Sequence, residues 1–336
     1  MVQAQKPSGP VGHIAGARSM QFLDVWPDLR EEPTYVVLGV QGSGTNLLCR
    51  ILHQAFGVSV TRDRSLICSA AARVARNPTR GNVARQMQRV YRSFFPGQVR
   101  RRLLSREFHH HSRNYLGVEE AIGKVETDSA ASFAEFWYSY HAFSNELSRK
   151  GIKSDDIWRH VSDFDAILPN RRLVRLLRDP RDNALSITSK DWGPRNVLCA
   201  AKFVADQASI YDHEVASHPE HSLVIKYEHL LMETASFVER FAEQFDALPR
   251  DGWRDRLQKI GIRSENRQKW RSLPTATLEH LESRLGPLLS GHGYDRATPD
   301  GNRPSPMQMV AWRVDDIARR LPQKIAKTWR RRILGH

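Results

Sequence analysis

The sequence predicts a three-layer α/β domain in which helices cover both faces of a central parallel sheet. Short apolar runs rich in β-branched residues alternate along the chain with longer segments of helical pattern, as in parallel sheets. Two of these runs also end directly in polar segments suited to anion binding. Strands are expected over residues 34–40, 57–61, 121–127, 171–177 and 222–228.

The first run, Tyr35 to Val40, leads into a glycine-bracketed loop, and helix-forming sequence begins at Thr45. A strand, a tight glycine loop and a helix N-terminus form an anion site, because backbone N–H groups and the positive end of the helix dipole converge there. Glycines allow close backbone approach, and short polar side chains add donors. The candidate binding residues are Gly42, Ser43, Gly44, Thr45 and Asn46.

This loop differs from the loop of nucleotide triphosphatases. Their pattern, GxxxxGK[ST], places a lysine on the outer phosphates and a hydroxyl on magnesium. Here Asn46 follows Thr45, and no lysine lies nearby. The loop is therefore expected to hold phosphate without hydrolysing ATP, and the alternative is a plain strand-to-helix connection.

The run 171–177 is followed by a charged segment, RDPRD, where a parallel strand would end. Pro180 suits a first helical turn, and Asp182 is favourable near a helix N-terminus. Ligands in open parallel sheets bind outside the carboxyl ends of strands, so Arg178 is expected to face the same crevice as the glycine loop. Ser186 lies about two helical turns further on and could bind the same anion. A solvated charge cluster is the alternative.

Together these segments resemble the sulfotransferases that use 3′-phosphoadenosine 5′-phosphosulfate (PAPS). GSGTNL, from Gly42, is similar to the family's 5′-phosphosulfate loop, and RDPRDNALS, Arg178 through Ser186, is similar to its 3′-phosphate element. Tyr227 in IKYEHL corresponds to a tyrosine near the adenine, and RSENRQKW, from Arg263, resembles a late RKGxxGDW segment. The resemblance implies a P-loop-like sulfotransferase fold of divergent bacterial type, with these segments at the donor site.

The chain also departs from the family pattern. Gly42 stands where many members have a lysine that stabilises the leaving phosphate, and Leu47 stands where eukaryotic cytosolic members have a tryptophan that stacks on adenine. The late segment lacks the family's glycines. Charge there is expected from a cationic side chain of the segment, Arg263, Arg267 or Lys269.

The resemblance implies transfer of a sulfuryl group from PAPS to a hydroxyl or amine. Such a transfer needs donors at the leaving oxygen and a base for the attacking group, and it requires no metal. The candidates for the base are, in order, Glu126, Asp63 and His160. Lys124 is a candidate to replace the missing loop lysine. The histidines 109–111 lack carboxylates placed to complete a site, so no metal is expected.

Composition and length indicate one large domain. A chain of 336 residues, 40% of them hydrophobic, can bury a sizeable core. A flexible tail is expected over 1–33 and the α/β domain over 34–295, with a mainly helical, arginine-rich insertion at 65–118. A linker and a basic amphipathic helix are expected over 296–336.

The chain is expected to be cytoplasmic. It has no run of about 20 apolar residues that could span a membrane. Its N-terminus lacks the apolar core of a secretion signal. The three scattered cysteines fit a reducing compartment.

The net charge of +14 is concentrated in two places. Residues 73–113 contain eleven arginines and a single acid, Glu107. The C-terminal region carries Val310, Val314 and Ile317 at helical spacing among many cations. The first segment is either a solvated face or a surface for an acidic glycan, a glycolipid headgroup or a membrane. The second either lies on anionic lipid or packs its apolar side on the domain.

These observations predict a PAPS-dependent sulfotransferase that acts on a glycan or glycolipid and contacts the inner face of the membrane peripherally. One alternative is a P-loop kinase or phosphotransferase. The other is a non-catalytic module that binds anions or a membrane. Nucleic acid is disfavoured as a partner, because few aromatic residues interleave the arginines.

Overall fold

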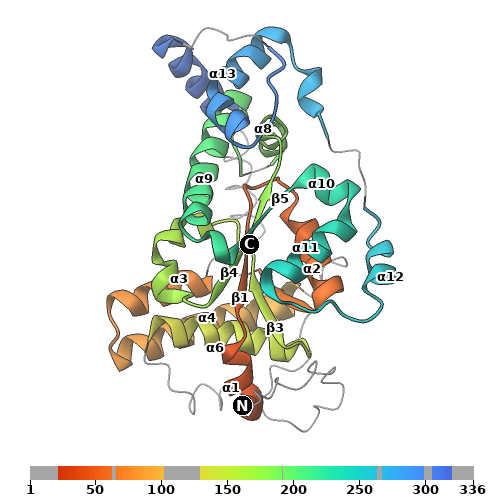
Figure 1. Ribbon diagram of the computed structural model, residues 1–336. Helices are drawn as coiled ribbons and strands as arrows, with labels where there is room; N and C mark the ends of the chain where they lie inside the picture. Colours follow the sequence, from red (N-terminus) through yellow and green to blue (C-terminus); the bar gives the residue numbers. More distant parts are fainter. Residues whose placement is uncertain are drawn as a thin grey trace.

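The centre of the molecule is a sheet of five parallel strands in the order β2-β3-β1-β4-β5. The strands are β1 (Thr34–Leu38), β2 (Val58–Thr61), β3 (Arg149–Ile152), β4 (Arg171–Leu177) and β5 (Ser222–Lys226). A computed structural model describes residues 22–62, 66–101, 129–190, 192–262, 267–298 and 305–319, with the side chains of 92–101 excepted. All strands point toward the same end of the molecule, the upper end in Figure 1.

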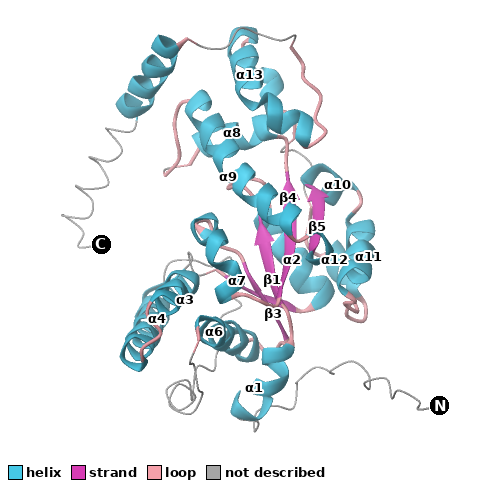
Figure 2. Ribbon diagram, turned by 60° about the vertical axis from the view of Figure 1, so that its left-hand side comes forward, coloured by secondary structure: helices cyan, strands magenta, loops and turns pink. Residues whose placement is uncertain are grey.

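Helices cover both faces of the sheet (Figures 1 and 2). One face carries α3 (Leu66–Arg76), α4 (Arg80–Arg101), α6 (Ala130–Ser144), α7 (Phe164–Ile167) and α9 (Val197–Ser217). The other carries α2 (Thr45–Phe56), α10 (Tyr227–Met232), α11 (Thr234–Phe245) and α12 (Trp253–Gln258). Beyond the carboxyl ends of the strands lie α8 (Pro180–Thr188) and α13 (Thr275–Gly291). The predicted three-layer α/β fold is confirmed.

Strand β1 shows why two separate cores form. Val36 and Leu38 pack into a cluster with α3 and α6, whereas Tyr35 and Val37 pack into a second cluster with α2 and α11. All four side chains are buried, because successive residues of a strand point to opposite faces and both faces are covered.

Four of the predicted strands coincide with β1, β2, β4 and β5, and the expected strand 121–127 lies outside the described residues. The remaining strand, β3, has the sequence RKGI, whose cations hide it from a search for apolar runs. It nevertheless lies between β1 and β2. Gly151 suits this position, since a Cβ there would lie 2.9 Å from the carbonyl oxygen of Tyr35.

Residues 22–31 belong to the segment 1–33, for which the sequence predicts a flexible tail, but they form helix α1 (Phe22–Glu31). Phe22 and Leu29 of this helix are buried. Lys150 of β3 forms an ion pair with Glu135 of α6, and its Nζ donates to the carbonyl oxygen of Leu29 over 2.6 Å. A buried ammonium needs such acceptors, so the end of α1 is held on the domain.

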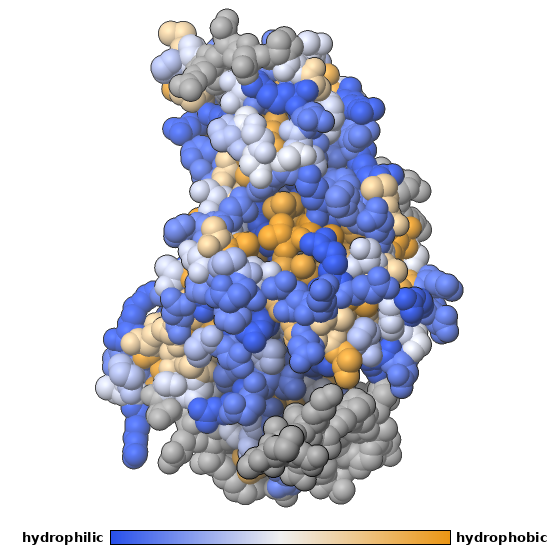
Figure 3. All heavy atoms as spheres, in the orientation of Figure 1, coloured by the Kyte–Doolittle hydropathy of each residue, from blue (hydrophilic) through white to orange (hydrophobic). Residues whose placement is uncertain are grey.

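Within the segment 65–118 the described residues, 66–101, form α3 and α4. Helix α3 contributes Ile67, Ala71 and Val74 to the core, while Arg73 and Arg76 are exposed. On the face shown in Figure 3 hydrophilic side chains prevail, and apolar side chains gather near its middle, over the region of β5.

The described residues also include a helix over 306–319 and short 3₁₀ turns. The 3₁₀ turns are η2 (Ile157–Asp163), η3 (Pro219–His221) and η4 (Lys269–Ser272).

Candidate active site

The loop after β1 leaves several polar groups without partners. Gly42 and Gly44 have φ values of +89° and +95°, a conformation that favours glycine. Gly44 is the N-cap of α2, and as a glycine it has no side chain to cap that end. Ser43 is completely buried, and its Oγ has no hydrogen-bond partner among the described residues. Because a buried hydroxyl and uncapped helical N–H groups need acceptors, this loop suits an anion.

The remaining predicted loop residues, Thr45 and Asn46, form the first turn of α2. Thr45 is buried and Asn46 is exposed.

The second predicted motif lies directly against this loop. A Cβ atom on Gly42 would lie 2.9 Å from Oγ of Ser186, which belongs to α8. Arg178, at the end of β4, donates from Nη1 to the carbonyl oxygen of Gly42 over 2.5 Å. The fold therefore brings together two motifs that are more than 130 residues apart in the sequence.

Tyr227, at the end of β5, completes this group. A Cβ on Gly44 would lie only 2.4 Å from Cε2 of Tyr227, so the ring packs against the loop. The guanidinium of Arg178 lies 5.1 Å from the ring centroid. Burial raises the pKa of the Tyr227 hydroxyl, while the charges of Arg178 and Arg267 act to lower it. The ends of β1, β4 and β5 thus meet at one point.

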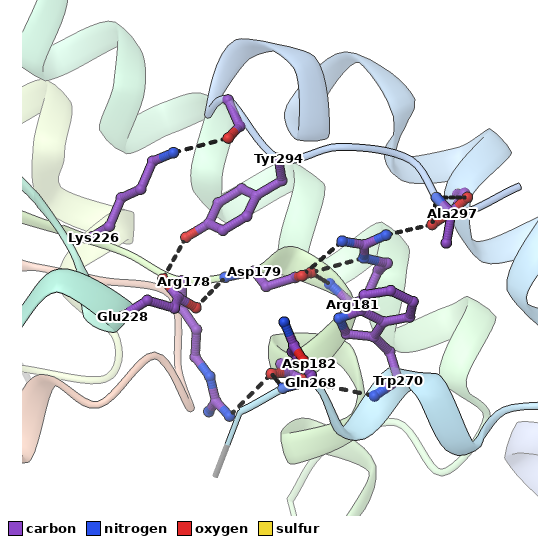
Figure 4. A network of polar contacts seen from close by, with 12 residues as sticks. Arg178, Asp179, Arg181, Asp182, Lys226, Glu228, Gln268, Trp270, Tyr294 and Ala297 are labelled. Atoms are coloured by element: carbon purple, nitrogen blue, oxygen red, sulfur yellow. Dashed lines mark hydrogen bonds and ion pairs between the residues drawn. The ribbon is translucent and has the colours of Figure 1, made fainter. Parts of the chain in front are cut away.

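Asp182 of α8 connects Arg178 to the late segment (Figure 4). Its carboxylate lies 3.8 Å from Nη2 of Arg178 and accepts from the backbone N–H groups of Gln268, over 2.7 Å, and Trp270, over 3.3 Å. Burial raises the pKa of Asp182, against the charge of Arg178. Arg263 lies outside the described residues, and Arg267 is the cation of this segment that acts on Tyr227.

A second group of contacts in Figure 4 fixes the start of α8. Arg181 forms ion pairs with Asp179, over 2.8 Å, and with Glu282 of α13. Glu228 accepts from the backbone N–H of Asp179, over 3.3 Å, and from the hydroxyl of Tyr294, over 2.8 Å. Asp179, Arg181 and Glu282 are buried, so these contacts hold the chain directly after Arg178.

A family model described as "Sulfotransferase family" matches residues 33–248, more than half of the chain. The chain belongs to the sulfotransferase family. The match covers the glycine loop, Arg178, Ser186 and Tyr227. No curated protein matches the sequence of this sulfotransferase.

Solved structures of similar shape are also sulfotransferases of low sequence identity. The sulfotransferase domain of the Synechococcus PCC 7002 olefin synthase has 16% identity and a TM-score of 0.48, over 80% of this chain and 96% of that one. The sulfotransferase domain of the curacin biosynthetic pathway has 13% identity and a TM-score of 0.49, over 79% and 98%. STF9 from Mycobacterium avium has 11% identity and a TM-score of 0.46, over 83% and 82%.

On the other side of the loop the sulfotransferase presents polar residues that no sequence pattern indicated. Lys153 and Asp155 follow β3 directly and form an ion pair. The backbone carbonyl of Asp155 accepts from Nε2 of Gln41 in the glycine loop, over 2.6 Å. Burial is the dominant effect on the thiol of Cys49 in α2 and raises its pKa. The charges of Arg62, which follows β2, and of Lys153 act to lower this pKa. The ends of β2 and β3 therefore place two cations and a carboxylate near the loop.

Of the three residues predicted as the catalytic base, only His160 lies within the described residues. Glu126 and Asp63, like Lys124, lie outside the described residues. His160 lies in η2, with its Nε2 2.9 Å from Oγ of Ser69 and its Nδ1 3.6 Å from Asp163. Its contacts therefore place it against α3. The signal that could have indicated Lys153 and Asp155 is their position directly after a strand, but β3 itself was not recognised.

The described residues contain neither a candidate metal centre nor a membrane-spanning helix. No group of three or more His, Cys, Asp or Glu side chains there is placed to hold a metal ion. Within the same ranges, none of the helices combines the length and the apolar character needed to cross a bilayer.

Proposed function

We propose that this sulfotransferase transfers a sulfuryl group from PAPS to a hydroxyl or amine of a carbohydrate-containing acceptor, a glycan or glycolipid. One observation carries the proposal. Gly42 of the glycine loop lies so close to Ser186 that a Cβ on it would be 2.9 Å from the hydroxyl oxygen, and it accepts a hydrogen bond from Arg178. The two anion-binding motifs therefore form one site. A nucleotide with phosphate groups at both its 3′ and 5′ positions would place one phosphate at each of the two motifs.

The donor site can be assigned residue by residue. The buried hydroxyl of Ser43 and the N–H groups of Gly44, Thr45 and Asn46 would hold the 5′-phosphosulfate, because they end at the uncapped N-terminus of α2. For the 3′-phosphate we assign Arg178 and Ser186. Tyr227 would lie near the adenine. Arg267, together with Arg263, would add positive charge from the late segment.

The groups after β3 supply the chemistry that the glycine loop lacks. When bound, PAPS provides a sulfuryl group attached to a phosphate leaving group. Asp155 would accept the proton of the attacking hydroxyl while the bond from acceptor oxygen to sulfur forms and the bond from sulfur to the bridging phosphate oxygen breaks. Lys153 would donate to that bridging oxygen as negative charge develops on it. The products are the sulfated acceptor and adenosine 3′,5′-bisphosphate.

The charge distribution supports an acidic or membrane-bound acceptor. The exposed arginines of α3 and α4 form a positive surface on a protein of net charge +14. Such a surface attracts anionic glycans and lipid headgroups. We place the protein in the cytoplasm, at the inner face of the membrane, and its three cysteines, none of them in a disulfide, suit a reducing compartment.

Calorimetric titration with adenosine 3′,5′-bisphosphate tests the donor assignment. We expect tight binding to the native protein and much weaker binding of ATP. Arg178→Ala should abolish the binding at moderate salt, and Ser186→Ala should weaken it. Arg172→Ala is the matched control, because Arg172 belongs to the same strand at its opposite end.

Unchanged affinity of the Arg178→Ala variant would overturn the proposal. Because Arg178 is buried, Arg178→Lys serves as a second variant that keeps the charge and loses the fork of donors. Binding of ATP and magnesium in preference to the bisphosphate would favour a kinase instead.

A further inference from the structure

Residues 306–319 form a helix that is attached to the domain along one side. Asp316 accepts from the backbone N–H groups of Arg195, over 2.5 Å, and Asn196, over 3.1 Å. The ring of Trp312 lies 5.4 Å from that of His280 in α13 and packs against the cluster formed by α8, α9 and α13. The orientation of this helix about its axis is therefore defined.

The opposite side of this helix exposes large apolar side chains. Met307 is 83% exposed, and Val310, Val314 and Ile317 are between 59% and 61% exposed. These four residues, here called the apolar stripe, recur every three or four positions and so share one face. The alternative in which this apolar side packs on the domain is therefore wrong for the described part of the helix.

The charges around the apolar stripe are arranged asymmetrically. The two acids of the helix turn toward the protein, where Asp316 is buried and Asp315 accepts from Nδ2 of Asn196 over 2.9 Å. Arg313 is exposed beside the stripe. Arg319 is exposed on the other side of the helix, where it forms an ion pair with Asp315 over 2.8 Å. The sequence that follows, 320–336, contains six cations and no acid. The outward surface of the described helix therefore combines the apolar stripe with the positive charge of Arg313, and the sequence that continues from it is basic.

We propose that the apolar stripe docks on a membrane surface that contains anionic lipids. Apolar side chains would enter the boundary between headgroups and acyl chains, and the flanking cations would contact lipid phosphates. A second copy of the chain is disfavoured as the partner of the apolar stripe, because two such surfaces would bring like charges together. This binding does not depend on the proposed sulfotransferase activity.

The position of the helix determines which end of the protein would face the membrane. It lies beyond α13, at the end of the molecule toward which the strands point (Figures 1 and 2). Docking there would bring the carboxyl ends of the strands, with the glycine loop and Arg178, toward the membrane. An acceptor carried by a lipid would then be presented to the site, a step that rests on the proposed function.

Sedimentation of the full-length protein with vesicles tests the proposal. We expect binding to vesicles of phosphatidylcholine mixed with phosphatidylglycerol, and little binding to phosphatidylcholine alone. Val310→Asp combined with Val314→Asp should weaken binding about tenfold or more, since the apolar contact is lost. Arg313→Ala should weaken it less and reduce its salt dependence.

The matched control is Met232→Asp combined with Leu248→Asp. These side chains are 59% and 65% exposed, so this control adds the same charge at equally exposed apolar positions outside the helix. It should lose only the small electrostatic part of the binding. Thermal unfolding of both double variants should match that of the native protein.

Three outcomes would overturn the proposal. In the first, the native protein does not sediment with anionic vesicles. In the second, the stripe variant binds these vesicles as well as the control variant does. In the third, sedimentation equilibrium shows a dimer that the stripe variant cannot form, which would identify a second copy as the occupant. In every case titration with the bisphosphate reports separately on the donor site.

Discussion

Position 44 must be glycine for two independent reasons. Its φ of +95° is a left-handed conformation that costs an L-residue about 1–2 kcal/mol. In addition, a side chain there would occupy the space of the Tyr227 ring. Loop conformation and the position of the ring are therefore coupled through one residue.

We expect Gly44→Ala to weaken the binding of adenosine 3′,5′-bisphosphate at least about tenfold, because the loop and Tyr227 must move apart. Titration calorimetry measures this change. Gly81→Ala in α4 is the control, since a Cβ there meets no atom within 4 Å and alanine favours a helix. Equal affinities of the two variants would show that the loop tolerates a side chain.

The residues after β3 allow a test of the chemical step alone. We expect Asp155→Asn to lower kcat by about 10²–10⁴-fold, the usual contribution of a general base. Lys153→Ala should also lower kcat. Asp155→Asn should keep its affinity for the bisphosphate, whereas Lys153→Ala should weaken it, because the oxygen that Lys153 contacts becomes part of the 5′-phosphate. Transfer of labelled sulfate from PAPS to acceptor extracts measures the rate.

Two residues of α9 serve as matched controls for this experiment. Lys202 and Asp206 also form an ion pair, 2.8 Å long, on an exposed surface. Lys202→Ala and Asp206→Asn should leave the rate unchanged. If Asp155→Asn retains the full rate, the base lies elsewhere, and Glu126 and Asp63 remain the candidates.

At the scale of elements, α13 holds the segment that follows it against α8. The carboxylate of Glu282 accepts from the backbone N–H groups of Ala297 and Thr298, each over 2.9 Å, and pairs with Arg181. Burial by itself would raise the pKa of Glu282. The hydrogen bonds from Thr298, Ala297 and Arg181 outweigh this effect and lower it.

This lowered pKa has a defined consequence for stability. The ionised carboxylate stabilises the folded state above the unfolded pKa, about 4.3, and this contribution is lost as the pH falls through the folded value. We expect Glu282→Gln to cost about 3–5 kcal/mol at neutral pH, the range for breaking a buried pair. The difference from the native protein should shrink in acid, as measured by urea unfolding at several pH values.

Glu239→Gln is the control for this prediction. Glu239 pairs with Arg254 on an exposed surface, where such a pair contributes about 0–1 kcal/mol. A stability difference for Glu282→Gln that stays constant from neutral to acidic pH would contradict the proposed role of its charge.

At the scale of the whole molecule, the parallel direction of the strands organises the site. The ends of β1, β4 and β5 supply the proposed donor site, and the ends of β2 and β3 supply Arg62, Lys153 and Asp155. The helix 306–319 lies at the same end (Figure 1). The proposed nucleotide binding, the proposed chemistry and the proposed membrane contact are therefore concentrated at one end of the molecule.

The sequence by itself determined the fold class, the glycine loop and the segment from Arg178 to Ser186. These features are local, because strand patterning, positive φ at glycine and the spacing of residues on one helix depend on near neighbours in the chain. Tyr227 was indicated by the resemblance of IKYEHL to a family segment, which is also a local pattern of the sequence.

Only the tertiary structure decided the features that depend on distant residues. β3 is a strand because β1 and β2 flank it, and α1 is held because Lys150 reaches its last carbonyl groups. The direction of the apolar stripe depends on Arg195 and Asn196, which are about 120 residues away from Asp316. Such contacts leave no periodic pattern in the sequence, because their partners are brought together only by folding.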